Sequence, residues 1–271
     1  MIIDVHAHIF PDSIALDVVP KMAEIAGIRE VLDGRLLSLR ESMKTAGIDA
    51  VWLQPVATKP QQVDKINRWM EEVRCEAVVA FGAVHPEYPD LGGLIRNLSS
   101  RGFPGVKIHP EYQTMTPLDS RWFPLYEAVI EEKMIILYHA GVDIGIPTIN
   151  STPQQFAELS ERFPDLTLIL AHMGGFQQWE EVAEHVCGLN VYLDTSYVFG
   201  HCSDEMFVSL ARAHGVDKVV FGADSPWADQ QADLEHLKHL PFSQDELDQI
   251  CGLNAQRILD SHRKPTSPHY C

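Results

Sequence analysis

Eight short apolar runs recur along the chain, and most are followed by a stretch whose apolar positions repeat with helical spacing. Runs of this length that alternate with helices are typical of strands in a parallel sheet, because each return to the sheet needs a crossover. The runs cover residues 2–9, 49–55, 77–84, 104–110, 134–139, 166–172, 189–195 and 217–224.

The segments between these runs predict the helices. After the first run a helical stretch is interrupted at Gly27 and Gly34 and ends near Gly47. Two or three short helices follow the last strand. The other predicted helices cover 61–75, 91–100, 121–133, 153–163, 179–187 and 203–214.

Eight strands that alternate with helices predict a (β/α)8 TIM barrel with extra C-terminal helices. An open doubly wound sheet is the alternative, but no glycine-rich phosphate loop follows the first run. The length of 271 residues suits one large barrel domain or two ordinary domains, and 45% hydrophobic residues suffice for a substantial core. No linker divides the chain, so we predict one domain over 1–260 and a tail over 261–271.

The net charge of −17 argues against nucleic acid or an anionic membrane as a partner, since both require basic surfaces. The five cysteines show no C-x-x-C spacing, which is typical of a reducing compartment. No signal peptide or long apolar segment is recognisable. We therefore predict an unprocessed cytoplasmic protein with a small-molecule substrate. The sequence leaves a homodimer open.

Polar residues lie where the predicted strands end. Five of the eight runs reach a histidine at or near their end, which is unusual because a buried ionisable group needs a partner. In barrels of this type the C-terminal strand ends form the active site. The polar residues at these ends are His6, His8, Gln54, His85, Lys107, His109, His139, His172, Asp194 and Asp224.

Alternation along the first strand places Asp4, His6 and His8 on one face, with both histidines close to its end. Together with His139 and Asp224 they would supply the nitrogen and oxygen donors that suit one divalent metal, with Zn²⁺ the predicted ion. Such an ion lowers the pKa of a bound water toward about 7. The donor set therefore predicts metal-assisted attack on a carbonyl group.

His172 and Asp224 are the predicted catalytic residues. Asp224 would accept the proton of the attacking water, although an aspartate before Ser-Pro also caps turns. His172 would orient that water or stabilise developing charge, and a role as ligand of a second metal stays open. For Asp4, Gln54, His85 and Asp194 a structural role is expected.

Four residues are predicted to contact the substrate: Lys107, His109, Tyr112 and Trp227. Lys107 would pair with a substrate carboxylate, or as a carbamate bridge two metals. We expect a single metal and an ordinary ammonium group, because acidic neighbours keep an amine protonated. Phe199 and His201 are further candidates for the pocket wall.

Several motifs resemble the amidohydrolase superfamily, and its second branch of amidohydrolase-related metal-dependent hydrolases in particular. The resemblance spans about residues 2–260 and implies a distorted TIM barrel with a metal at the strand ends. It also implies metal ligation by His6, His8, His139 and Asp224, with His172 as catalytic histidine. The motifs are Asp4-Val-His6-Ala-His8, Gly105-Val-Lys107-Ile-His109-Pro110, His139, Ala171-His172-Met-Gly-Gly175, Gly222-Ala-Asp224-Ser-Pro226 and the closing Gly252–Leu259 segment.

Three functions follow from these observations. The first is a metal-dependent hydrolase that attacks an amide, lactone or ester carbonyl with a metal-activated water. The second is a metal-dependent non-hydrolytic decarboxylase of a small carboxylic acid, since the branch also contains decarboxylases and members with altered metal dependence. The third is a non-catalytic binding barrel, against which the proton-transfer candidates Asp224 and His172 weigh.

Overall fold

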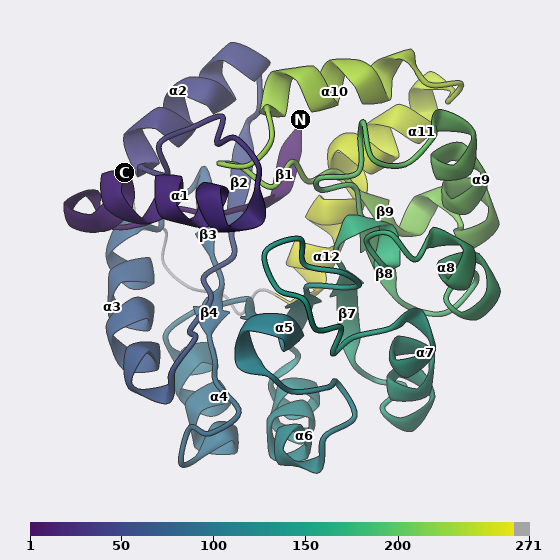
Figure 1. Cartoon of the computed structure of the whole chain (residues 1–271). Coiled ribbons are helices and arrows are strands. Elements are labelled where there is room, and N and C mark those ends of the chain that lie inside the picture. The colour runs from purple at the N-terminus through teal and green to yellow at the C-terminus, as the bar shows by residue number, and fades with distance from the viewer. Residues whose placement is uncertain (263–271) are drawn as a thin grey trace.

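The computed structural model describes residues 1–262 and shows a distorted (β/α)8 barrel, as predicted (Figure 1). All neighbouring strands pair in parallel, in one sheet of order β1-β2-β3 and one of order β4-β5-β6-β7-β8-β9. The strands are β1 (Ile3–Ala7), β2 (Ala50–Leu53), β3 (Val78–Ala80), β4 (Gly82–Ala83), β5 (Gly105–Ile108), β6 (Ile135–Tyr138), β7 (Thr167–Leu170), β8 (Tyr192–Asp194) and β9 (Val219–Val220).

The third predicted strand, 77–84, is divided into β3 and β4 at Phe81. The Phe81 N–H still donates to the carbonyl of Leu53 at 3.0 Å, whereas Gly82 already pairs with Val106 of β5. One continuous segment therefore leaves the first sheet and joins the second. This makes eight barrel staves from nine assigned strands.

Hydrogen bonds between the β9 segment and β1 close the barrel. The Val5 N–H donates to the Phe221 carbonyl at 2.9 Å, and the Asp224 N–H donates to the His6 carbonyl at 2.8 Å. The His8 N–H donates to the Ser225 carbonyl at 2.6 Å. Closure therefore brings Asp224 beside the two histidines of the first strand.

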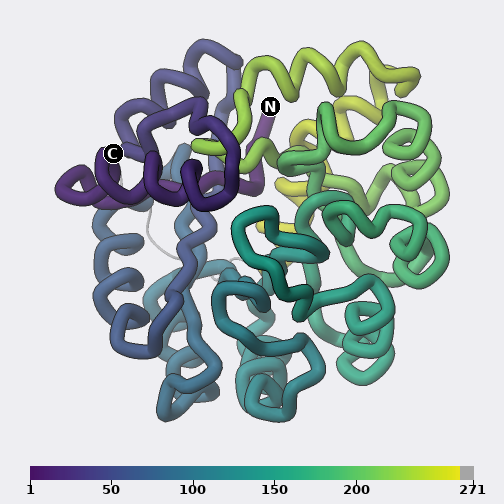
Figure 2. The backbone as a smooth tube through the Cα atoms, viewed as in Figure 1, coloured from purple at the N-terminus to yellow at the C-terminus, as the bar shows by residue number. Residues whose placement is uncertain are grey.

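Helices surround the strands, as Figures 1 and 2 show. Each is amphipathic or short enough to be anchored by its neighbours. They are α1 (Asp12–Ala26), α2 (Leu36–Ala46), α3 (Val63–Val73), α4 (Leu91–Ser100), α5 (Pro110–Gln113), α6 (Phe123–Glu132), α7 (Pro153–Arg162), α8 (Trp179–His185), α9 (Asp204–His214), α10 (Gln230–His239), α11 (Gln244–Asp248) and α12 (Asn254–His262).

The core has two parts, one between strands and helices and one inside the barrel. Inside, strand residues such as Val5 and Leu137 pack with Ala255, Ile258 and Leu259 of α12. The C-terminal helix thus fills one end of the barrel, and the polar site occupies the other.

Strict alternation fails within β1. Ile3 and Val5 pack in the inner cluster, but Ala7 packs in the outer one, and the pairing with β2 shifts register between Asp4 and Ala7. The irregularity lies where His6 turns toward the site. Strand irregularities near active sites commonly redirect a side chain in this way.

The predicted extra C-terminal helices are present, and the last of them extends to His262. The predicted tail, 261–271, overlaps α12 in its first two residues, and the rest lies outside the described residues. Across residues 1–262, every helix falls short of the length and apolar character that a membrane span requires.

Candidate metal-binding active site

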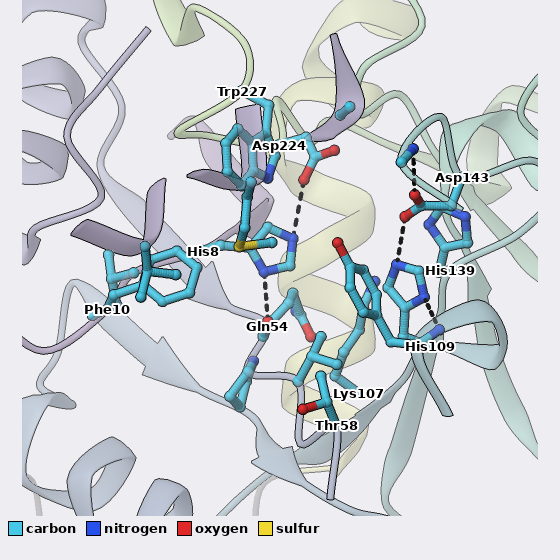
Figure 3. A pocket seen from close by; sticks show the side chains of 18 of the residues that line it. His8, Phe10, Gln54, Thr58, Lys107, His109, His139, Asp143, Asp224 and Trp227 are labelled. Carbon is cyan, nitrogen blue, oxygen red and sulfur yellow. Dashed lines mark hydrogen bonds and ion pairs between the residues drawn. The ribbon is translucent and has the colours of Figure 1, made fainter. Parts of the chain in front are cut away.

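A cavity of about 590 Å³ lies at the C-terminal ends of the strands (Figure 3). This volume is in the range of small-molecule sites, about 300–1,000 Å³. Every residue that the sequence predicts for the site lines this one cavity, although the chain contributes them from six separate segments. These residues are His6, His8, Lys107, His109, Tyr112, His139, His172, Asp224 and Trp227.

His6, His8 and Asp224 form a group that we call the β1/β9 cluster. One donor atom from each lies within 4.8 Å of the other two. Asp224 Oδ1 is 3.0 Å from His8 Nε2 and 3.6 Å from His6 Nε2. The three donors therefore converge on one small volume at the cavity floor.

The protonation of this cluster follows from its neighbours. His8 Nδ1 lies 2.7 Å from the Gln54 carbonyl, which can only accept, so Nδ1 carries the proton. His6 Nδ1 lies 2.8 Å from Asp194 Oδ2 and is protonated for the same reason. Both Nε2 atoms thus present lone pairs toward Asp224 Oδ1, which is buried and has no hydrogen-bond donor among the described residues. Converging lone pairs fit a divalent cation.

Asp194 holds this arrangement from behind. Its Oδ1 accepts hydrogen bonds from the backbone N–H groups of His172 and Ser196, both at 3.0 Å. Burial alone would raise the pKa of Asp194, but His6, His172 and Ser196 outweigh it and hold the pKa well below its usual range. A carboxylate that fixes the far nitrogen of a metal-binding histidine is a recurrent support for such sites.

Asp4 also supports the floor. It accepts hydrogen bonds from the His6 N–H at 2.9 Å, the Ala223 N–H at 3.0 Å and the Gln230 side chain at 2.7 Å. Burial raises the pKa of Asp4 to about 7 despite these donors. Its contacts are structural, and it couples β1 to α10.

His109, His139 and Asp143 form a second group, the β5/β6 cluster, with donors again within 4.8 Å of one another. His109 Nε2 lies 3.4 Å from Asp143 Oδ2, and the rings of His109 and His139 are stacked with centroids 4.0 Å apart. The structure therefore groups His139 with these residues rather than with His6, His8 and Asp224.

His139 connects this cluster to His172. His172 Nδ1 faces the Ser196 carbonyl at 2.8 Å, so its Nε2 must accept from the protonated Nδ1 of His139 at 3.0 Å. His139 Nε2 is then a buried lone pair without a hydrogen-bond partner, 3.8 Å from Glu111 Oε2, which also lacks one. Burial raises the pKa of Glu111 to about 7 and keeps the pKa of His139 well below its usual value.

Lys107 is buried at the cavity floor, with Nζ 3.2 Å from His6 Nε2. Burial lowers its pKa to about 8, against the opposing effect of Asp194, Asp224 and Glu111. The acidic neighbours expected to keep the amine protonated are therefore outweighed by desolvation. The ammonium form still predominates at neutral pH.

Two of the predicted catalytic residues have unusual backbone conformations. Asp224 has φ 76° and His172 has φ 58°, both in the left-handed region that residues other than glycine seldom adopt. Such conformations cost about 1–3 kcal/mol and gather at functional sites, where surrounding structure enforces them. The hydrogen bonds that close the barrel enforce the one at Asp224.

Phe199, His201 and His85 are not among the residues that line the cavity. Sequence reasoning missed Glu111, Asp143 and Ser196. Glu111 directly follows the strand-end pair His109-Pro110, a position where a polar residue is ordinarily exposed. A search for every acidic residue just after a strand would have found it, together with many irrelevant ones.

A family model described as Amidohydrolase matches residues 3–260, nearly all of the chain. No curated protein matches it. Solved structures that resemble it are all remote in sequence and show the fold alone. An uncharacterised TIM-barrel protein from Bordetella bronchiseptica has a TM-score of 0.74 and 19% identity, covering 96% of this chain and 99% of that one.

Two further similar structures have named activities. A 5-carboxyvanillate decarboxylase from Novosphingobium aromaticivorans, solved with manganese, has a TM-score of 0.72 and 15% identity, covering 96% of both chains. A candidate 2-pyrone-4,6-dicarboxylic acid hydrolase from Pseudomonas putida has a TM-score of 0.69 and 14% identity, covering 97% of this chain and 98% of that one. Decarboxylation and hydrolysis are thus both represented on this fold.

Proposed function

We propose that this chain, which belongs to the amidohydrolase family, hydrolyses an amide, lactone or ester carbonyl in a small molecule with the help of one divalent metal ion. The observation that carries the proposal is the convergence of two histidine lone pairs on Asp224 Oδ1 at the floor of a cavity. A site with lone pairs from His6, His8 and Asp224 and without a proton among them is suited to a cation.

The metal ligands in this proposal are His6, His8 and Asp224, with His139 as the fourth. Two imidazoles and a carboxylate suit Zn²⁺, and Mn²⁺ is the second choice because one similar structure contains manganese. When bound, such an ion acts as a Lewis acid that polarises a carbonyl group and lowers the pKa of water to about 7.

The protein side chains provide positioning and proton transfer. His172 is fixed by Ser196 through Nδ1, so its Nε2 is the atom that can hold or release a proton on the cavity side. Asp224 would accept the proton of the attacking water and return it to the leaving group. Lys107, as an ammonium, would bind a carboxylate or the oxygen of the reacting group.

Decarboxylation is the second candidate, and Lys107 favours it. A buried ammonium 3.2 Å from His6 Nε2 is well placed to orient a carboxylate beside the metal ligands. The activity names of several similar structures are decarboxylases of aromatic acids. In this case carbon dioxide leaves and a proton takes its place on the substrate carbon, and no hydrolytic water is needed.

The two candidates are separable in one experiment. Protein loaded with Zn²⁺ or Mn²⁺ is incubated with a panel of esters, lactones, amides and hydroxybenzoic acids, and acid release and carbon dioxide release are measured together. Hydrolysis gives acid without carbon dioxide. Carbon dioxide alone would replace the first candidate by the second. Failure to bind either metal would contradict both, and the His8→Ala variant serves as the background control.

We also propose that the partner of this protein is its small-molecule substrate and not a nucleic acid. The net charge of −17 supports this, since it repels a phosphate backbone.

A further inference from the structure

Helix α1 has a second apolar face besides the one that packs in the core. The core face consists of small and medium residues, Ala15, Val19 and Ala23. The second face lines the cavity with larger residues, although Ile14 is 44% exposed and Ile25 is 73% exposed. The cavity-lining residues of this face, spaced at one helical turn, are Ile14, Val18, Met22 and Ile25.

Other segments add apolar side chains to the same cavity. Ile66 and Trp69 of α3 line it, and so do Val142 and Ile144 in the segment after β6. Ile144 is 41% exposed. These residues and the second face of α1 make up what we call the apolar half of the cavity, which is continuous with the histidines and carboxylates of the floor.

The charges of the cavity are distributed unevenly. Its lining in the described chain includes only two lysines and no arginine. Lys107 lies at the floor beside His6, and Lys65 is exposed on α3. A second carboxylate on the far side of a ligand would therefore meet apolar walls and the carboxylate of Asp143 without a buried cation, which is unfavourable.

We propose, on the basis of the function proposed above, that the substrate has one polar head and a bulky apolar group. The head is the carbonyl or carboxylate group that reacts at the floor. The apolar group is an aryl or alkyl chain that lies against the Ile14–Ile25 face of α1. The concave shape and its continuity with the floor favour a substrate over a second copy of the chain as the occupant.

A series of alkyl hydroxamates tests this proposal, because a hydroxamate head binds divalent metals whatever its tail. Zn²⁺-loaded protein is titrated with acetohydroxamate, butanohydroxamate and hexanohydroxamate by calorimetry. We expect Kd to fall about three- to fourfold for each added methylene, the usual gain for apolar burial. Adipic acid monohydroxamate has the same chain length as hexanohydroxamate but ends in a carboxylate. We expect it to lose most of this gain.

Variants of α1 locate the effect. Ile14→Gln and Met22→Gln should each weaken hexanohydroxamate binding about fivefold and leave acetohydroxamate unchanged. Leu16→Gln is the matched control, since Leu16 lies on the same helix and is 59% exposed but does not line the cavity. It should change neither ligand.

The outcomes separate the two proposals. If acetohydroxamate fails to bind, the proposed metal site is wrong and the substrate assignment fails with it. If acetohydroxamate binds but Kd is independent of chain length, the substrate assignment alone is overturned. It is likewise overturned if sedimentation shows a dimer that Ile14→Gln dissociates, because the apolar half would then be covered by a second copy.

Discussion

The two histidine clusters at the cavity floor differ in how their rings are held. In the β1/β9 cluster the far nitrogen of each histidine is fixed by an acceptor outside the cluster, Asp194 for His6 and the Gln54 carbonyl for His8. In the β5/β6 cluster the rings of His109 and His139 stack on each other, and His139 donates to His172. The first cluster is anchored to strands, and the second is held mainly by its own members.

This difference matters because a histidine with a fixed far nitrogen presents its other lone pair in a set direction. His6 and His8 do so toward Asp224. His139 instead uses one nitrogen on His172 and leaves the other without a hydrogen-bond partner. The comparison therefore favours the β1/β9 cluster as the place where a cation binds, and the following predictions test it.

Removal of both histidines of the first strand should have the largest effect. We expect the double variant His6→Ala, His8→Ala to lose at least about 10²-fold in metal affinity, because only Asp224 would remain of the anchored donors. Metal content is measured by elemental analysis after dialysis. The matched control is the double variant His109→Ala, Asp143→Asn, which removes the other cluster and should keep the metal. Full metal content in the His6/His8 variant would reverse the comparison.

His172 lies between the clusters and should affect turnover more than binding. We expect His172→Asn to retain the metal and to slow turnover by about 10²–10⁴, the usual range for the loss of an acid or base. Turnover is measured on whichever substrate the panel identifies, together with metal content. Loss of metal along with activity would make His172 a ligand, and this cluster boundary would have to be redrawn.

His139 is the residue on which the sequence and the structure group the donors differently. The proposed function makes it the fourth ligand of a single metal, whereas the structure stacks it on His109. We expect His139→Ala to weaken metal binding about 10-fold, less than the double variant, and purified protein to contain about one metal per chain. Unchanged affinity would remove His139 from the ligand set. Two metals per chain would show that the β5/β6 cluster also binds an ion, or that Lys107 bridges two ions as a carbamate.

Much of the fold was predictable because each strand is a compact apolar run. The run at 77–84 was found as one strand, but its division at Phe81 depends on which neighbouring strand each residue pairs with. Pairing of that kind is a property of the closed barrel. No local pattern records it.

The candidate site was predictable wherever an ionisable residue ends an apolar run, as at His139 and Asp224. Glu111 escaped because its burial depends on Asn150 and Ser151, which donate to its Oε1 at 3.0 Å from a distant loop. The grouping of His139 escaped for a related reason, since it rests on ring orientation rather than on sequence position. Sequence identifies which residues reach the cavity, and side-chain packing decides which of them meet.

The smallest predicted effect concerns the carboxylates behind the β1/β9 cluster. Burial, aided by Asp4, Asp229 and Asp224, raises the pKa of Asp233 on α10 to about 8. Its Oδ2 is buried and has no hydrogen-bond partner among the described residues. An unfolded chain releases this proton near pH 4, so the folded protein binds one more proton than the unfolded chain between about pH 4 and pH 8.

The stability that Asp233 contributes should therefore be greatest at low pH and be lost as the pH rises toward 8. The slope cannot exceed about 1.4 kcal/mol per pH unit, the limit for one proton. We expect Asp233→Asn to remove this component, so that its free energy of unfolding, measured by urea denaturation of metal-free protein, falls less between pH 5 and pH 8 than that of the wild type. Asp165→Asn, at an exposed position, is the control and should follow the wild type. Equal slopes for all three proteins would mean that Asp233 is ionised in the folded state, and that the anchored cluster has no buried acid of raised pKa at this position on α10.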